Sequence, residues 1–192
     1  MITRGLTFRR WVLATWIGWI LGIPCIIALA LLGEAVGIGG SQGLVGAGMG
    51  AGVGWMQSRA LRGILDRRQA WLASCIGGLA VPFVATDVAK LLGWQSLYSV
   101  YPAVALGGLI AGVWQASILR ARFDRTFAWG LASALGWTLA AGAVAVSDWL
   151  SHSHSLRGIW GALAYLGIIA MGGLLVGAVT GLAFAWMPRR ES

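Results

Sequence analysis

The side chains that could perform chemistry are few and lie near the ends of apolar stretches. The chain holds six Asp and Glu residues and two histidines. Both histidines, His152 and His154, lie in one SHSHS segment, which could hold a surface metal ion but is more simply a solvated loop. Glu34, Asp87 and Asp148 could together bind a cation, although solvated helix ends are the simpler interpretation. Because no carboxylate pair and no nucleophile with a base lies within an apolar stretch, the sequence predicts no catalytic residue, no metal site and no enzymatic activity.

Gln57 and Gln115 are the most informative polar residues. Each follows the last glycine of a spaced glycine run by three residues, so it lies on nearly the same helix face as those glycines. One interpretation is a hydrogen bond to a neighbouring helix or a cap on its end. The alternative is a polar ring at the mouth of an axial pocket. No charged residue or histidine lies in the middle of an apolar stretch, which argues against a proton-driven transporter.

The composition indicates that these residues are positioned by helices in a membrane. Of the 192 residues, 58% are hydrophobic and only 10% are charged, whereas soluble domains are about 25% charged. The net charge of +8 comes from short basic runs between apolar stretches rather than from one patch on a polar domain, so we expect no nucleic-acid partner. Cys25 and Cys75 lie inside apolar stretches and are expected to be small buried hydrophobes.

Six stretches are long enough to cross a bilayer, which requires about 20 apolar residues in helical form. They are residues 11–32, 38–57, 70–90, 98–118, 127–149 and 158–187, and they leave no room for a separate soluble domain. Twelve arginines lie on one side of these spans, while only Lys90 and Arg157 lie on the other. By the positive-inside rule both termini are cytoplasmic, in the bacterial cytoplasmic membrane or an intracellular membrane derived from it. The twelve are Arg4, Arg9, Arg10, Arg59, Arg62, Arg67, Arg68, Arg120, Arg122, Arg125, Arg189 and Arg190.

The segment from Gly46 to Gly78 repeats with a shift of 58 residues, and such a repeat identifies the structural unit. The matches include Gly54 with Gly112, Gln57 with Gln115, Leu61 with Leu119, Arg62 with Arg120 and Trp71 with Trp129. A third copy is divided between the two ends of the chain, where Thr7–Gly18 and the glycines near 177 resemble its halves, and Phe184 stands where the glutamines stand. We therefore predict an all-α bundle of three helical hairpins with pseudo-threefold symmetry, in which the first and last helices are adjacent.

Small residues spaced by four allow helices to approach closely in lipid. The predicted helix-packing residues are Gly46, Gly50, Gly54, Gly108, Gly112, Gly173, Gly177 and Gly181. Gly48 and Gly52 lie on a second face of the same span, so that span is expected to pack against neighbours on both sides.

The tryptophans lie near the predicted span ends, which favours an interfacial belt. The set comprises Trp11, Trp71, Trp94, Trp129, Trp149, Trp160 and Trp186. Thr7, Asp66 and Asp124 occupy equivalent places before spans and are expected to cap those helices.

The basic loops are expected to contact anionic lipid headgroups through Arg62, Arg67, Arg120 and Arg125, with a cytosolic protein partner as the alternative. No cofactor is predicted, whereas bound lipid is.

The pattern GxxxGxxQxxxLR, followed by a segment with Trp, Ala-Ser and Gly, resembles a broad group of small multi-spanning bacterial membrane proteins of unassigned function. In this chain Gly108, Gly112, Gln115, Leu119 and Arg120 carry it, with the Trp129–Gly136 segment after them and a weaker copy from Gly50 to Gly77. The resemblance implies a topology and no biochemistry.

The sequence favours a non-enzymatic structural or accessory subunit that packs against other subunits of a larger respiratory or photosynthetic complex. The alternative is a bundle that binds or transports a neutral or amphipathic small molecule, including the substrate-capturing component of a transporter. A lipid-handling protein is a third possibility.

Overall fold

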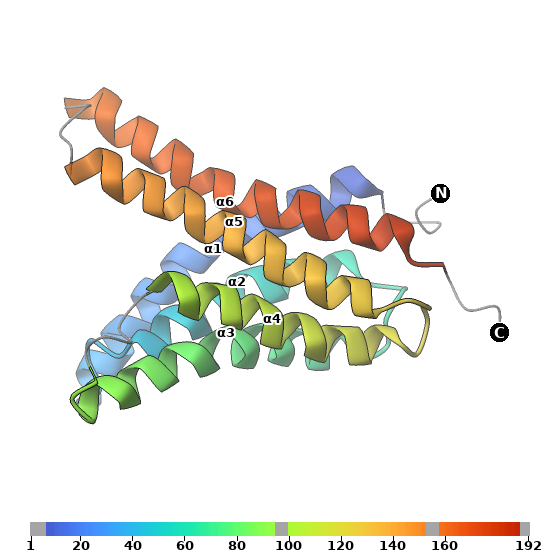
Figure 1. Cartoon of the computed structure of the whole chain (residues 1–192), viewed down its shortest axis with the longest axis horizontal. Helices are drawn as coiled ribbons and strands as arrows, with labels where there is room; N and C mark the ends of the chain where they lie inside the picture. The colour runs from blue at the N-terminus through green and yellow to red at the C-terminus, as the bar shows by residue number, and fades with distance from the viewer. Residues whose placement is uncertain (1–6, 95–99, 153–157, 189–192) are drawn as a thin grey trace.

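The computed structural model describes residues 7–94, 100–152 and 158–188, which form six α-helices (Figure 1). The helices are α1 (Phe8–Ala35), α2 (Gln42–Ala60), α3 (Arg68–Leu91), α4 (Val100–Leu119), α5 (Phe127–His152) and α6 (Gly158–Trp186). Five of them are long and apolar enough to cross a membrane, and α2 is the exception. Glycine adds little to mean hydropathy, and α2 is rich in glycine. More than half of the residues of α2 are buried inside the bundle. The prediction of an all-helical membrane protein is confirmed.

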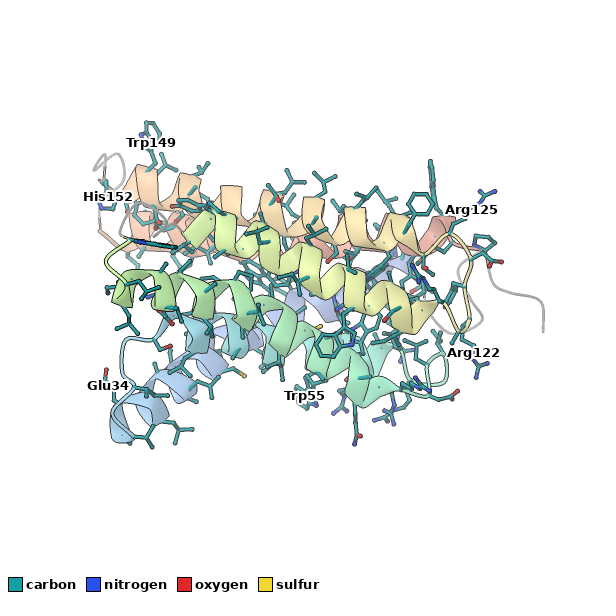
Figure 2. The ribbon with its side chains drawn as sticks, turned by 60° about the horizontal axis from the view of Figure 1, so that its bottom comes forward. Glu34, Trp55, Arg122, Arg125, Trp149 and His152 are labelled. Atoms are coloured by element: carbon teal, nitrogen blue, oxygen red, sulfur yellow. The ribbon has the colours of Figure 1, made fainter. Side chains whose placement is uncertain are left out.

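The helices form a closed ring. Each helix packs against the next one in the chain, and α6 packs against α1. Figure 2 shows Arg122 and Arg125 at one end of the bundle and Glu34, Trp149 and His152 at the other. We call the first the arginine end; it carries the α2–α3 and α4–α5 loops, the start of α1 and the end of α6 (Figure 1).

Helix α2 lies between α1 and α3, and its glycines form both contacts. A β-carbon built at Gly46 would lie 2.5 Å from the backbone oxygen of Leu79 on α3. Gly50 and Gly54 meet α3 at Cys75. On the opposite face, a β-carbon at Gly48 would lie 2.6 Å from the backbone nitrogen of Ile26 on α1. These contacts position α2 by backbone-to-backbone packing, which larger side chains would prevent.

The other predicted packing glycines also contact neighbours in the same chain. Gly108 and Gly112 of α4 lie against Trp137 and Ser133 of α5. On α6, Gly173 meets Trp19, Gly177 meets Val12 and Gly181 meets Phe8, all on α1. The contacts of α1 with α6 therefore lie toward the arginine end. Farther away the two helices diverge (Figure 1), and Ile159 and Leu163 of α6 are exposed.

Side-chain carboxylates form hydrogen bonds that link the ends of neighbouring helices. Asp87 of α3 caps α2, because its carboxylate accepts hydrogen bonds from the backbone of Gln42 (3.0 Å) and Gly43 (2.9 Å). This cap and the left-handed φ angles of 80° at Gly37 and 73° at Gly40 explain why α2 begins at Gln42 rather than at residue 38. Asp148 accepts a hydrogen bond from the Tyr101 hydroxyl at 3.1 Å, which links α5 to α4.

The capping predictions differ among the three equivalent positions. Thr7 caps α1, since its hydroxyl accepts a hydrogen bond from the backbone N–H of Arg10 at 3.2 Å. The prediction for Asp66 is wrong: Arg67 is the residue before α3, and Asp66 instead pairs with Arg122 at 2.8 Å. Asp124 stands three residues before the start of α5 at Phe127, and its capping role stays a prediction. The Asp66–Arg122 pair is exposed and contributes at most about 1 kcal/mol to stability.

Candidate functional site: an aromatic plug and an apolar axial cavity

Three tryptophans from alternate helices meet inside the ring at its arginine end. Trp11 of α1, Trp71 of α3 and Trp129 of α5 have ring centroids 5.5 to 6.2 Å apart and are at most 1% exposed. Placing these three in an interfacial belt was therefore wrong. They lie near the ends of their helices, but Leu65 and Phe123 from the two loops are buried in the same apolar cluster. The loops thus extend the core past the helix ends.

The tryptophans that remain at the surface lie at other helix ends. Trp149, Trp160 and Trp186 are each more than two-thirds exposed, and Figure 2 shows Trp149 pointing away from the bundle. Trp94 is also exposed, just after α3. A wet indole N–H and an apolar ring suit a membrane interface, so of the seven tryptophans named from the sequence these four fit the interfacial interpretation.

Gln57 links three helices through hydrogen bonds. Its side-chain oxygen accepts from the indole N–H of Trp71 at 3.2 Å, and its side-chain nitrogen donates to the hydroxyl of Thr15 on α1 at 3.1 Å. Gln57 is only 3% exposed. A buried primary amide needs such partners because desolvation without them costs about 1–3 kcal/mol.

Gln115 repeats this arrangement on the next pair of helices. Its oxygen accepts from the indole N–H of Trp129 at 2.8 Å, and its nitrogen donates to the sulfur of Cys75 on α3 at 3.0 Å. Cys75, expected to be a plain buried hydrophobe, is therefore also a hydrogen-bond acceptor. Both glutamines lie inside a packed cluster, where about 10 Å³ of space remains, the lower limit for one water molecule.

The third tryptophan, Trp11, donates to an acceptor that does not stand at the position equivalent to Gln57 and Gln115. The indole N–H of Trp11 donates to the hydroxyl of Thr180 on α6 at 3.0 Å, and that hydroxyl donates to the backbone oxygen of Val176 at 2.6 Å. Phe184, one turn later, instead packs its ring 5.4 Å from Trp11 and 5.3 Å from Trp129. The third hairpin thus replaces an amide by a threonine and a phenylalanine.

We call Trp11, Trp71 and Trp129, together with Gln57, Gln115, Thr180 and Phe184, the plug. Sequence reasoning missed Thr15 and Thr180. A signal for Thr15 was present, because Thr15, Cys75 and Ser133 each follow a plug tryptophan by four residues, and Ser133 donates to the backbone of Gly108 at 2.8 Å. Thr180 had no such signal, since the repeat pointed to Phe184. The plug closes the axis of the ring at its arginine end.

A second aromatic layer lies next to the plug. Trp19 and Trp137 have ring centroids 5.6 Å apart and share a buried cluster with Leu79. Each of the three lies two turns further along its helix than a plug tryptophan, so the two layers stack along the axis. Within the described ranges, the indole N–H of Trp19 is buried without a hydrogen-bond partner.

An apolar cavity of about 250 Å³ lies beyond this second layer, in the half of the bundle away from the arginines. Trp19, Leu79 and Trp137 form its floor, and every helix contributes to its walls, for example through Ile23, Met49, Phe83, Val104, Val144 and Ile169. Its volume exceeds the roughly 150 Å³ of an apolar cavity that holds benzene, and it approaches the lower end of small-molecule sites. Ile23 of α1, one of the lining residues, is 36% exposed, and α1 and α6 diverge away from the arginine end (Figure 1).

The arginines named from the sequence lie in different settings at the arginine end. Arg62 lines a groove between α1 and α2, and Arg67 lines another between α2 and α3. Arg120 and Arg125 lie in the α4–α5 connection, where Arg125 has a left-handed φ of 55°. All four are exposed.

The SHSHS segment falls partly outside the described residues, and His154 is among those not described. The ring of His152 lies 2.7 Å from the backbone oxygen of Asp148. In the described part of the chain, no group of three His, Cys, Asp or Glu side chains could hold a metal ion.

Comparison of the chain with models of known protein families, with curated proteins and with solved structures gives no match.

Proposed function

We propose that the chain spans the membrane six times, as three hairpins related by a pseudo-threefold axis, with both termini and the arginine end in the cytoplasm. The plug supports this symmetry, because Trp71 with Gln57, Trp129 with Gln115 and Trp11 with Thr180 form three similar pairs. The arginines support the orientation through the positive-inside rule. A bacterial cytoplasmic membrane, or one derived from it, is the proposed location.

Within that frame, the protein is proposed to bind an apolar molecule, or the apolar part of an amphipathic one, in the axial cavity. The observation that carries this proposal is the cavity itself, which is apolar throughout and receives residues from all six helices. No charged side chain lines it, so binding would rest on dispersion and shape rather than on hydrogen bonds. The plug would hold the ligand in one half of the membrane, which suits capture or storage better than conduction.

This function is preferred to that of an accessory subunit because of where the glycines lie. An accessory role drew support from small-residue stripes that could dock on foreign helices. All eight predicted packing glycines contact neighbouring helices of this chain, so those stripes are already occupied. The same arrangement supports a self-contained bundle.

Filling the cavity tests this proposal. We expect Ala141→Phe and Val104→Phe, which place a ring among the lining residues, to lower retention of a co-purifying apolar molecule by about ten-fold, a loss of about 1.4 kcal/mol. Native mass spectrometry of protein gently extracted from its own membrane measures the adduct. Val146→Phe and Leu106→Phe are matched controls on the same two helices, because both positions are about half exposed and absent from the lining. Equal adduct levels in the filled and control variants would refute an axial binding site.

A further inference from the structure

A second candidate site lies outside the ring, between α1 and α2 at the arginine end. The two helices are in backbone contact where Gly18 meets Gly52, and a β-carbon at Gly18 would lie 2.7 Å from the α-carbon of Val53. From this crossing toward the arginine end they leave a groove of about 570 Å³. We call it the α1–α2 groove. It is separate from the axial cavity and shares no lining residue with it.

The groove has an apolar part and a basic part. Leu13, Ile17 and Met56 line the part nearer the glycine crossing, and Leu13 is 53% exposed. Four arginines line the end nearer the loop, two from each side: Arg9 and Arg10 from α1, Arg59 and Arg62 from α2 and its end. No acidic side chain is among its lining residues, which come from the described part of the chain. The apolar strip is complementary to the acyl chain of an anionic lipid, and the cluster of arginines is complementary to its headgroup.

This charge is a property of the groove and not of basic loops in general. The neighbouring groove between α2 and α3, of about 600 Å³, places Arg67 and Arg68 beside Asp66. Asp66 in turn pairs with Arg122 at 2.8 Å, so acid and base offset each other there. In the α1–α2 groove Arg9, Arg59 and Arg62 have no such acidic neighbour among the lining residues.

The repeat supplies a second contrast. The equivalence of Trp11 with Trp71 relates α1 to α3 by 60 residues, and that of Gln57 with Gln115 relates α2 to α4 by 58, so the α1–α2 groove corresponds to the surface between α3 and α4. There Trp114 replaces Met56, Ser117 replaces Arg59, and Gln69 and Ala70 replace Arg9 and Arg10. A bulky ring thus stands where the apolar strip would continue, and three of the four arginines are missing. Of these two helix pairs, the first alone combines an open strip with four arginines.

We propose that the α1–α2 groove binds one anionic phospholipid, with its phosphate among Arg9, Arg59 and Arg62 and an acyl chain along Leu13, Ile17 and Met56. Guanidinium groups bind phosphate oxygens in pairs of parallel hydrogen bonds, which gives these contacts both strength and direction. The positive end of the α1 dipole lies at the same place and adds to the attraction for a phosphate. The site is independent of the axial cavity, so either proposal can fail without the other.

Titration of delipidated protein with phosphatidylglycerol, followed by native mass spectrometry, tests this site. The triple variant Arg9→Gln/Arg59→Gln/Arg62→Gln is expected to weaken the first phosphatidylglycerol bound by at least about ten-fold. The matched control Arg67→Gln/Arg68→Gln/Arg120→Gln removes the same charge from elsewhere on the arginine end and is expected to change it by less than about two-fold. Phosphatidylcholine is expected to bind the wild-type groove at least about ten-fold more weakly than phosphatidylglycerol.

A variant that keeps every charge tests the apolar part. Met56→Trp copies the residue at the corresponding place on α4 and should fill the strip, so we expect about a ten-fold loss of phosphatidylglycerol binding. Val113→Trp, at an exposed position of α4, is its control, and Ala141→Phe in the axial cavity should also leave this binding unchanged.

Equal losses in the two arginine triples would overturn the proposal in favour of diffuse surface charge. Unchanged binding in Met56→Trp, or displacement of the lipid by inorganic phosphate alone, would overturn it in favour of a site for free anions.

Discussion

Replacement of Gly52 by leucine is expected to prevent the chain from forming a stable folded bundle. A β-carbon at Gly52 would collide with the backbone nitrogen of Gly22 and the backbone oxygen of Gly18 on α1. Backbone atoms cannot rotate away as a side chain can, so α1 and α2 would have to separate along their whole contact. Overpacking costs about 1–3 kcal/mol where side chains can adjust, and we expect at least about 3 kcal/mol here.

Thermal unfolding in detergent, followed by size-exclusion chromatography, measures this effect. Gly142→Leu and Gly167→Leu are matched controls, because nothing lies within 4 Å of a β-carbon at either position. These controls are expected to unfold within a few degrees of the wild type. A Gly52→Leu protein as stable as the two controls would show that α1 and α2 do not make this contact.

The second large effect is expected for Trp129→Ala in the plug. Trp129 is 1% exposed, contacts Trp11, Trp71 and Phe184, and donates to Gln115. Removal of a buried tryptophan ring costs about 3–5 kcal/mol through lost contacts and the cavity that remains. Trp149→Ala, at a position 69% exposed, is the control and is expected to change stability by less than about 0.5 kcal/mol.

A double-mutant cycle separates the hydrogen bond from the packing. Trp129→Phe keeps an aromatic ring but removes the N–H, and Gln115→Leu keeps the approximate volume but removes the amide. Because the two groups are 2.8 Å apart, we expect a coupling free energy of about 1 kcal/mol or more. Additive effects of the two substitutions, measured by chemical unfolding, would contradict a direct bond between Trp129 and Gln115.

Much of the fold can be predicted from sequence patterns that have a local physical cause. Long apolar runs separated by basic loops indicate membrane helices, because hydrocarbon leaves no partner for an unpaired backbone group. The glycine runs also predict close helix contacts, and the partial repeat at the two ends of the chain led us to expect α1 next to α6, where the structure places it. Glycine is apolar only weakly, however, so the hydropathy that identifies five of the helices misses α2.

The candidate site was less predictable because it depends on tertiary placement. A tryptophan near a helix end can face lipid headgroups or the inside of the bundle, and nothing local distinguishes Trp71 from Trp149. Trp71 is buried because Leu65 and Phe123 extend the core past the helix ends. Helix periodicity in the sequence does not predict how the loops that carry these two residues fold. Asp87 is a similar case, since its partners on α2 lie more than 40 residues away in the chain. The axial cavity left no sequence signal, because it is bounded by ordinary apolar residues.

The proposed binding function depends most on the axial cavity, and site-resolved photolabelling tests binding there most directly. The probe is a fatty acid with a diazirine near the end of its chain, added to the protein in phosphatidylcholine nanodiscs and located by peptide mass spectrometry. We predict saturable labelling of cavity residues such as Met49, Phe83 and Val144, lost in Ala141→Phe and retained in Val146→Phe. Labelling confined to outward-facing residues such as Leu135 and Val113, without saturation and unchanged in Ala141→Phe, would contradict a binding site inside the ring.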